Sequence, residues 1–418
     1  MEMTSTWNNI RINEGRFHND FLELCQFGKI GETGLNRPAL SEAHSQAREW
    51  FHQKARQAGL QINVDGAGNH SAQLTCDIPG APTLLIGSHL DSVPTGGRFD
   101  GSLGVLAALE TLRTIKEHEI HLPVCLEAID FTDEEGTLVS FLGSYAYSGK
   151  LVEENLTNPR SDPQKLSISL AKAGLTAQGI LNARHDPATL VGYLEMHVEQ
   201  GPLLESQGVH IGVVTHISGI AFYRLTYHGK AGHAGTISMS ERQDAAQGAS
   251  AFTLAARQII LDQFPDCFSN VGVIHFEPGL FNVIPEKAVL GFEFRSAYAE
   301  SFKQLEMALL QRAQEEADRY NLYLDVEFLG QRDPVELNST FRLTIKDAAT
   351  QIGLSTMPII SRAGHDAQAL ADICPTGMIF IPSVAGISHS PEELSHWEDC
   401  VNGANVLLQT TLCIANRQ

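Results

Sequence analysis

A histidine and two aspartates lie within the short glycine-rich segment 87–101. They are His89, Asp91 and Asp100, and they follow an apolar run, Thr83–Ile86, whose length and bounding residues predict a buried strand. Apolar residues then recur at roughly helical spacing, so we expect the three side chains in the loop at the carboxyl end of a strand, where open α/β sheets bind ligands. Imidazole and carboxylate groups together suit a divalent metal ion such as zinc. Taken alone, the segment fits a solvated turn equally well.

Three further strand-to-loop junctions carry histidines or carboxylates. The predicted strand Val124–Phe131 runs into Thr132-Asp-Glu-Glu-Gly136, where neighbouring carboxylates repel each other unless a cation or a proton compensates them. The segments Glu195-Met-His-Val-Glu-Gln-Gly201 and Gly386-Ile-Ser-His-Ser-Pro-Glu-Glu393 also follow strand candidates. A single junction of this kind is more typical of an exposed turn or a structural histidine. Together the four junctions favour one common metal site.

Strand and helix patterns alternate through the first half of the chain. A helix is predicted at Ser41–Ala58, with Ser41 as its N-cap, and another after Gly101. The expected strands are Leu60–Val64, Ala72–Leu74, Thr83–Ile86, Val124–Phe131, Tyr193–His197 and Ile211–Val214. This alternation predicts an α/β sheet.

The order of elements changes between about residues 221 and 330. The patterns there predict strand, helix, strand, strand, helix and strand, at Ala221–Tyr227, Arg242–Leu261, Asn270–Glu277, Ala288–Phe294, Ser301–Tyr320 and Tyr323–Phe328. This β-α-β-β-α-β order is that of the ferredoxin-like unit, so we expect an inserted small domain. The chain then resumes with predicted helices at Ser339–Ile352 and Asp399–Ala415 around a strand at Met378–Ile381.

Length and composition narrow the class of protein. A chain of 418 residues exceeds the size at which one core usually stops growing, which predicts two domains. A net charge of -20 argues against nucleic acid or an anionic membrane as a partner. The seven cysteines are scattered and include no C-x-x-C pair, as expected for free thiols in a reducing compartment. No secretory or membrane-spanning segment is recognisable, so a cytoplasmic location is expected.

Several motifs in a fixed order resemble one enzyme family. The chain is similar to the metal-dependent amidohydrolases related to the M20 peptidases, in the branch of N-carbamoyl-L-amino-acid hydrolases, β-ureidopropionase and allantoate amidohydrolase. The resemblance extends over nearly the whole chain. It rests on the motifs Gly87-Ser-His-Leu-Asp-Ser92, Gly96-Gly-Arg-Phe-Asp-Gly101, Glu134-Glu-Gly136, His197-Val-Glu-Gln-Gly201, Gly232-His-Ala-Gly235, Gly364-His-Asp-Ala367 and Gly386-Ile-Ser-His389.

The resemblance implies a fold and a domain plan. We expect an α/β, mixed-sheet, metallopeptidase-like catalytic domain formed by residues 1–217 and 331–418. Residues 218–330 are expected to form an inserted ferredoxin-like (βαββαβ) lid and dimerisation domain. A homodimer through the inserted domain is therefore implied.

The resemblance also implies a ligand set for two divalent metal ions. Asp100 bridges the ions, and the other ligands are His89, Glu135, His197 and His389. Three imidazoles and two carboxylates suit zinc, manganese, cobalt or nickel. Asp91 is expected to accept the ring N–H of His89 and so fix its tautomer. Glu134 is left free of metal and is implied as the general base.

The implied substrate-binding residues lie in or near the inserted domain. Arg295 matches a residue that binds the substrate α-carboxylate, with Asn282 beside it, and Gln200 matches a contact to the ureido or carboxylate end. His233 matches a histidine that reaches the active site from the partner subunit and stabilises the oxyanion. On its own, an arginine such as Arg295 is more typical of a solvated strand position.

The predicted function is hydrolysis of the carbamoyl C–N bond of an N-carbamoyl-L-amino acid to the amino acid, carbon dioxide and ammonia. Three alternatives stay open: an allantoate amidohydrolase, an aminoacylase or dipeptidase, and a protein that binds metal and a ureido compound without turnover. Thr137-Leu-Val-Ser-Phe141, Thr236-Ile-Ser-Met239 and Arg362 depart from the common family pattern near the pocket, which leaves the side-chain preference open.

Overall fold

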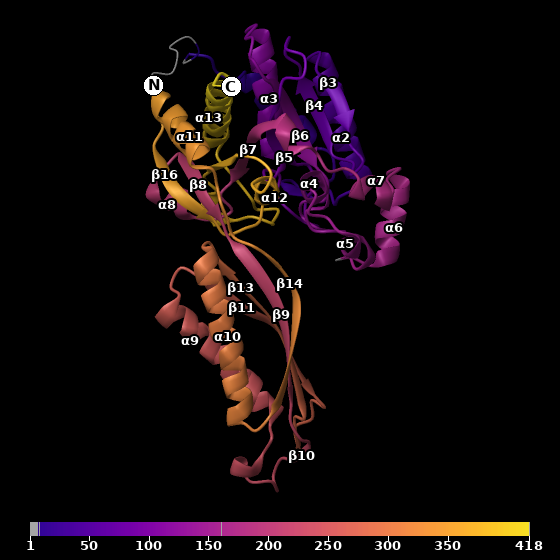
Figure 1. Cartoon of the computed structure of the whole chain (residues 1–418), viewed down its shortest axis with the longest axis vertical. Coiled ribbons are helices and arrows are strands. Elements are labelled where there is room, and N and C mark those ends of the chain that lie inside the picture. The colour runs from indigo at the N-terminus through magenta and orange to yellow at the C-terminus, as the bar shows by residue number, and fades with distance from the viewer. Residues whose placement is uncertain (1–6, 8, 160, 418) are drawn as a thin grey trace. The chain divides into compact units, whose positions relative to one another are not determined.

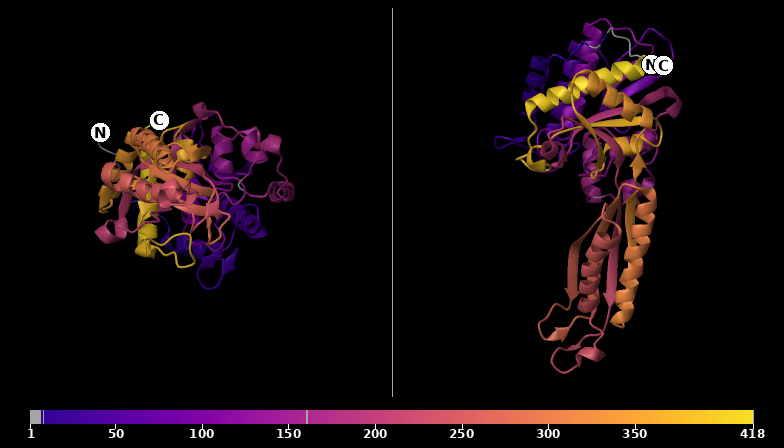
Figure 2. Two further views of the ribbon diagram at one scale, coloured as in Figure 1. Left: turned by 90° about the horizontal axis from the view of Figure 1, so that it is seen from below. Right: turned by 90° about the vertical axis from the view of Figure 1, so that its left-hand side faces the viewer.

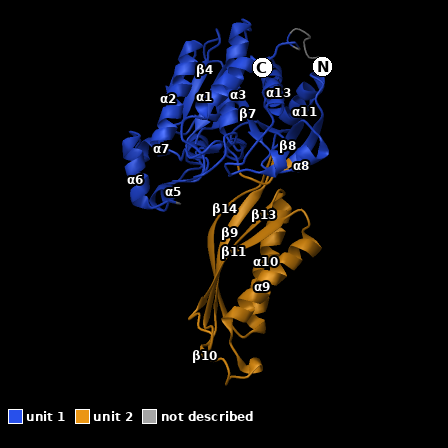
Figure 3. Ribbon diagram, turned by 180° about the vertical axis from the view of Figure 1, so that it is seen from behind, with its two compact units in different colours: residues 1–215, 337–359, 365–418 blue, residues 216–336, 360–364 orange. Residues whose placement is uncertain are grey.

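The chain divides into two compact units. The computed structural model describes residue 7 and residues 9–159 and 161–417 (Figure 1). Unit 1 comprises residues 1–215, 337–359 and 365–418, and unit 2 comprises residues 216–336 and 360–364 (Figure 3). No helix of the described residues is long and apolar enough to span a membrane. Each of the seven cysteines is a free thiol.

A large mixed sheet forms the centre of unit 1. Its strands have the order β15-β8-β17-β7-β5-β6-β4-β3, and β16 also pairs with β8. Strand β5 is parallel to β6 and β7, and β17 is parallel to β7, whereas β3, β4 and β8 pair antiparallel with their neighbours. This confirms the predicted α/β class with a mixed sheet. The bounds are β3 Gln61–Val64, β4 His70–Leu74, β5 Thr83–His89, β6 Cys125–Phe131, β7 Leu190–Val198, β8 Ile211–Ile217, β15 Val335–Glu336, β16 Thr356–Ser361 and β17 Thr376–Ile381.

Helices bury the central strands of this sheet. Helix α3 (Ser102–Glu117) is buried from Ser102 through Ile115, and its sequence is apolar on almost every side, as expected for a helix inside a core. It packs on β5, β6 and β7, and α13 (Trp397–Ala415) packs on α3, β7 and β17. Figure 2 shows α13, in yellow, beside the sheet of unit 1. The central strands are therefore held in rigid positions.

Shorter helices complete unit 1. Helix α2 (Glu42–Gln57) begins as predicted, with the Ser41 hydroxyl accepting a hydrogen bond from the amide of His44 at 3.2 Å. Helix α1 and strand β16 were not predicted from the sequence. The remaining helices of unit 1 have five to thirteen residues. They are α1 Glu14–Leu24, α4 Leu142–Ser148, α5 Glu153–Thr157, α6 Pro163–Lys172, α7 Ala177–Leu181, α8 Leu203–Gln207, α11 Ser339–Gln351 and α12 Asp366–Leu370.

Unit 2 is an antiparallel sheet covered by two helices. Its main elements follow the order β9 (Gly219–His228), α9 (Ala245–Gln263), β11 (Phe268–Glu277), β13 (Lys287–Ser296), α10 (Ala299–Arg319) and β14 (Tyr323–Arg332). The sheet order is β11-β13-β9-β14. Alternate residues of β13 are buried, and α9 and α10 pack on this sheet. Unit 2 also contains a small antiparallel pair of strands, β10 (Gly232–His233) and β12 (Val283–Ile284). Strand β10 follows β9 in the chain, and β12 precedes β13.

A buried arginine joins three segments of unit 1. The guanidinium of Arg37 is fully buried and donates to the carbonyl of Leu90 at 2.6 Å, the carbonyl of Leu24 at 3.1 Å and the hydroxyl of Ser102 at 2.5 Å. These partners lie at the end of α1, just after β5 and at the first turn of α3. Burial lowers the pKa of Arg37 to about 10, so the group stays charged at neutral pH. Arg37 thus fixes the loop that carries His89 and Asp100.

We expect Arg37→Met to lower the free energy of unfolding by about 3 kcal/mol, because it removes the hydrogen bonds that the buried guanidinium donates to Leu90, Leu24 and Ser102. Urea denaturation followed by circular dichroism measures the change. Arg56→Met is the matched control, since the Arg56 side chain is 56% exposed and pairs only with Glu49. Equal stability of the two variants would contradict the assigned role of Arg37.

Candidate metal centre

Four parallel strands of unit 1 bring the predicted metal-binding side chains to one edge of the sheet. Strand β5 ends at His89, β7 carries His197 one residue before its end, Glu134 and Glu135 follow β6, and His389 follows β17. Because β5, β6, β7 and β17 run in the same direction, their carboxyl ends meet at the same edge.

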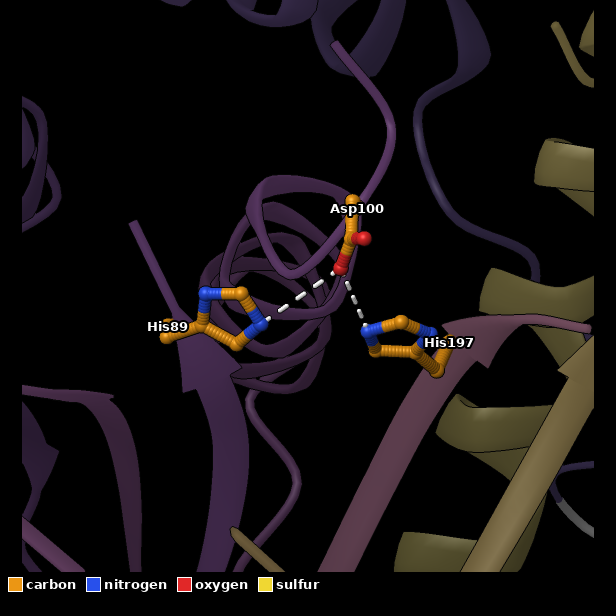
Figure 4. A group of neighbouring side chains, drawn as sticks. All are labelled: His89, Asp100 and His197. Atoms are coloured by element: carbon orange, nitrogen blue, oxygen red, sulfur yellow. Dashed lines mark ion pairs between the residues drawn. The ribbon is translucent and has the colours of Figure 1, made fainter. Parts of the chain in front are cut away.

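The carboxylate of Asp100 lies between two groups of donors. Its Oδ1 is 3.0 Å from Nε2 of His197 and 3.5 Å from Nε2 of His89 (Figure 4). Its Oδ2 is 3.3 Å from Nε2 of His389, which is 3.6 Å from the carboxylate of Glu135. The spacing of the donor atoms makes each group a candidate to hold a metal ion, with Asp100 common to both.

Backbone carbonyls orient the two buried imidazoles. Nδ1 of His89 lies 3.0 Å from the carbonyl oxygen of Asp91, and Nδ1 of His197 lies 2.9 Å from that of Val198. When each Nδ1 carries the hydrogen that these carbonyls accept, each Nε2 turns a lone pair toward Asp100. In the neutral imidazoles these lone pairs face the Asp100 carboxylate and repel it, and a cation placed among the donors would remove this repulsion.

The role of Asp91 differs from the prediction. Its carboxylate oxygen is 3.8 Å from the ring of His89, and it is the backbone carbonyl that the ring contacts. The carboxylate instead accepts hydrogen bonds from the amides of Glu134 and Glu135, both at 3.3 Å. Asp91 therefore fixes the position of the acidic loop after β6. The difference arises because the backbone carbonyl of Asp91 lies closer to Nδ1 of His89 than the carboxylate does, at 3.0 Å against 3.8 Å.

Negative charge is concentrated at this edge of the sheet. Burial raises the pKa of Glu134 well above its usual value, and the charges of Asp366 and Glu135 raise it further. Burial and the charge of Asp100 raise the pKa of Glu135 to about 7. Buried carboxylates that repel one another to this extent are relieved by a bound cation. This cluster of buried carboxylates is a second feature of the site that fits metal ions.

Glu134 lies next to the donor groups without belonging to either of them. The side chain is 8% exposed, and its carboxylate oxygen is 3.6 Å from Nε2 of His89. It belongs to neither of the two groups that share Asp100. Its carboxylate thus lies within the site and outside both groups of donor atoms.

Gln200 offers an unused hydrogen-bond acceptor at the site. Its Nε2 donates to Oδ2 of Asp100 at 2.8 Å, whereas its Oε1 is buried and has no hydrogen-bond partner. The backbone of Gln200 is held at φ 58°, and those of Asp133 and His389 at 57° and 54°. Left-handed conformations of residues other than glycine cost energy and are concentrated at functional sites.

The other predicted substrate residues lie in unit 2. Nδ1 of His233 accepts a hydrogen bond from the amide of Gly235, and the carbonyl of Asn282 accepts one from the amide of Ala234, both at 3.0 Å. His233 and Asn282 therefore lie close together. Arg295, near the far end of β13, donates to Glu293 at 3.0 Å, and it does not share this location.

Two further buried residues lie beside the metal-binding groups. The sequence places His365 in the motif Gly364-His-Asp-Ala367 and leaves its role open, and it does not single out Glu393. His365 is buried and its ring lies edge-on to that of His197, with 4.6 Å between ring centroids. Glu393 is 1% exposed and accepts hydrogen bonds from the amides of Phe99 and Asp100. The only sequence signal for Glu393 is its place in the segment after β17 that also carries His389.

Comparisons with known proteins agree over nearly the full length of the chain. Residues 85–412 match the sequence profile of Peptidase family M20/M25/M40. An N-carbamoyl-L-amino acid amidohydrolase of Geobacillus stearothermophilus is 36% identical, over 97% of this chain and 99% of the relative. A ureidoglycolate hydrolase of Arabidopsis thaliana is 33% identical, over 96% of this chain and 86% of the relative.

Solved structures give the same result. The crystal structure of an amidase of the hydantoinase/carbamoylase family from Burkholderia multivorans superimposes with a TM-score of 0.88 at 32% sequence identity, covering 97% of this chain and 98% of that one. The order of the motifs, the fold and these similarities lead to one assignment. The chain belongs to peptidase family M20/M25/M40.

Proposed function

We propose that this protein hydrolyses the carbamoyl C–N bond of N-carbamoyl-L-amino acids to the amino acid, carbon dioxide and ammonia. The observation that carries the proposal is the Asp100 carboxylate between two donor groups, with the unliganded Glu134 beside them. The N-carbamoyl-L-amino acid amidohydrolases among the relatives support this bond as the one that is cleaved.

The two donor groups would hold two divalent ions, chosen from zinc, manganese, cobalt and nickel. His89, His197 and Oδ1 of Asp100 form one set, and Glu135, His389 and Oδ2 of Asp100 form the other. When bound, such ions polarise the substrate carbonyl and lower the pKa of water.

Glu134 then acts as the general base. Its carboxylate takes a proton from the attacking water and later delivers it to the leaving nitrogen, so one group serves both halves of the reaction. Its buried position, which raises its pKa, favours a carboxylate that holds a proton between these steps. The free Oε1 of Gln200 accepts a hydrogen bond from a ureido N–H of the substrate.

Arg295 binds the substrate α-carboxylate in this proposal. A guanidinium presents two parallel N–H donors that match a carboxylate, and the Arg295 side chain is 34% exposed. Its present partners, Glu293 and the carbonyl of Arg362, lie on the surface of unit 2 and can be exchanged for a ligand. This contact would select substrates that carry a free carboxylate.

The length of β13 supports a contribution of His233 from a second copy. Asn282 precedes the first residue of β13, Lys287, whereas Arg295 is its penultimate residue. Eight steps along a strand span roughly 26 Å. A single unit 2 therefore cannot bring Arg295 and the His233–Asn282 pair to one small molecule, and a homodimer in which each copy supplies His233 and Asn282 to the other removes the difficulty.

The edge of unit 2 offers a surface for that dimer. Strand β11 is an edge strand with Val273 58% exposed and Ile274 47% exposed. On the neighbouring helix α9, Leu254 is 73% exposed and Leu261 is 54% exposed. An uncovered apolar edge strand is unfavourable in water, and pairing with a second copy would cover it.

Hydrolysis of a ureide such as allantoate is the second candidate, because ureidoglycolate hydrolases are among the relatives. Metal-loaded protein should be tested with N-carbamoyl-L- and D-amino acids, N-carbamoyl-β-alanine, allantoate, ureidoglycolate and N-acetyl-amino acids, with ammonia and free amine both quantified. We expect the N-carbamoyl-L-amino acids to be the best substrates. Faster release of ammonia from allantoate or ureidoglycolate would favour the second candidate.

We expect Glu134→Gln to lower kcat by about 10²–10⁴-fold while substrate and metal still bind, because the amide cannot carry the proton. Steady-state kinetics and metal analysis measure the two effects. Glu153→Gln, on an exposed part of α5, removes the same charge and should leave kcat unchanged. An unaltered kcat in Glu134→Gln would refute the assignment of the base.

Arg295→Lys should raise KM by about 10–100-fold, because an ammonium group cannot form both hydrogen bonds to a carboxylate. The loss should disappear with N-carbamoyl-amino-acid amides, which lack the carboxylate. Arg224→Lys serves as the control, since Arg224 lies on the same sheet and pairs with Glu327 at 2.6 Å on the surface. An equal KM for acid substrates in both variants contradicts the role of Arg295.

A mixing experiment tests the contribution of the second copy. His233→Ala and Glu134→Gln should each be nearly inactive, yet after joint refolding or subunit exchange about a quarter of the activity should return, since half of the dimers are mixed and each holds one intact site. If activity stays absent although mixed dimers form, His233 acts within its own chain or outside the site.

A further inference from the structure

The carboxylate of Glu393 is buried against the backbone that carries Asp100. Its Oε1 accepts hydrogen bonds from the amide of Phe99 at 2.8 Å and from the amide of Asp100 at 3.0 Å. The residue is 1% exposed, although it comes from a segment almost three hundred residues away in sequence. A carboxylate that accepts two adjacent amide hydrogens fixes the orientation of both peptide groups.

The other oxygen of Glu393 reaches the loop of His389. Oε2 accepts a hydrogen bond from the hydroxyl of Ser388 at 2.8 Å, and the same hydroxyl is 3.3 Å from Oδ2 of Asp100. Ser388 directly precedes His389, whose backbone is held at φ 54°. One carboxylate therefore connects the backbone amide of Asp100 to the side chain of Ser388, the residue before His389. Asp100 and His389 face each other at 3.3 Å.

The glycine at position 97 makes room for this carboxylate. A Cβ atom built on Gly97 would lie 2.2 Å from Oε1 of Glu393 and 2.4 Å from its Cβ. Such distances are far shorter than van der Waals contact, so any side chain at position 97 would displace Glu393. Packing against Glu393 thus explains why glycine is required at position 97.

The carboxylate of Glu393 accepts hydrogen bonds from two amides and one hydroxyl, all of them uncharged groups. Placing one more carboxylate beside a site that already contains Asp100 and Glu135 is unfavourable in the metal-free protein. The same charge is favourable once cations lie nearby.

We propose that Glu393 is a positioning residue of the metal centre, which holds Asp100 and His389 in register and adds negative charge that strengthens the binding of the ions. The inference rests on the proposed two-ion site. Glu393 itself touches neither substrate nor metal in this role.

Glu393→Gln separates this role from a purely structural one. The amide retains the shape and one acceptor but removes the charge, so the affinity of the metal-free protein for Zn²⁺ or Mn²⁺, measured by calorimetry, should fall by about 10–100-fold. The unfolding temperature of the metal-free protein should stay equal or rise, because a repulsive buried charge is lost. Glu392→Gln is the matched control, since Glu392 is the exposed neighbour and loses the same charge.

Gly97→Ala provides a second variant that alters no charge. Displacement of Glu393 by the added methyl group should reduce metal affinity in the same way, and Glu392→Gln should stay within twofold of the parent. Metal affinity within twofold of the parent in Glu393→Gln, or an affinity loss matched by an equally destabilised metal-free protein, would overturn the proposal. If the parent protein itself binds fewer than two ions, the proposed two-ion function is refuted. The number of ions bound by the parent therefore tests the proposed function, and the affinity of Glu393→Gln tests the role of Glu393.

Discussion

The repulsion among buried carboxylates around Asp100 is the constraint on which the rest of the site depends. Asp100, Glu134 and Glu135 lie at one sheet edge, and each is almost excluded from water. Without a cation, such a cluster is stable only if it takes up protons. The packing of unit 1 must therefore supply the free energy that keeps the cluster together. Metal ions that bind there would reduce the repulsion and so stabilise the folded protein.

Two different structural devices hold the donors in place. His89 and His197 lie on β5 and β7, whose side chains are buried nearly throughout, so their positions are fixed by the core. Asp100, Glu135 and His389 lie on loops, which the core does not fix. These loops are held by hydrogen bonds from buried polar groups: Arg37 and Asp91 on one side, and Glu393 on the other. The loops thus depend on buried charged residues to hold their positions, whereas the strands are held by packing in the core.

This difference explains how much of the site could be predicted. The ligand set could be inferred because histidines and carboxylates follow apolar strand patterns, and parallel strands bring their carboxyl ends together. Most of the long strands and helices of both units followed from periodicity, whereas helix α1 and strand β16 were missed. The segment of β16, Thr356-Met-Pro-Ile-Ile-Ser, contains a proline and shows no alternation. The contacts of Asp91 and Glu393 are made with backbone amides, which leave no signal in a sequence. Their roles therefore required coordinates.

The separation of Arg295 from His233 and Asn282 in unit 2 means that the proposed site needs a second copy of the chain to be complete. In a symmetric dimer every interface contact occurs twice, so a copy that receives His233 and Asn282 from its partner also supplies them in return. Arg295, at the other end of β13, stays with its own chain. On this arrangement a folded monomer would keep the metal ligands and the proposed carboxylate-binding Arg295, but it would lack His233, the proposed oxyanion-stabilising group, and Asn282. Activity would then depend on protein concentration through dimer formation even where each copy is fully folded, because assembly, and not folding, completes the site.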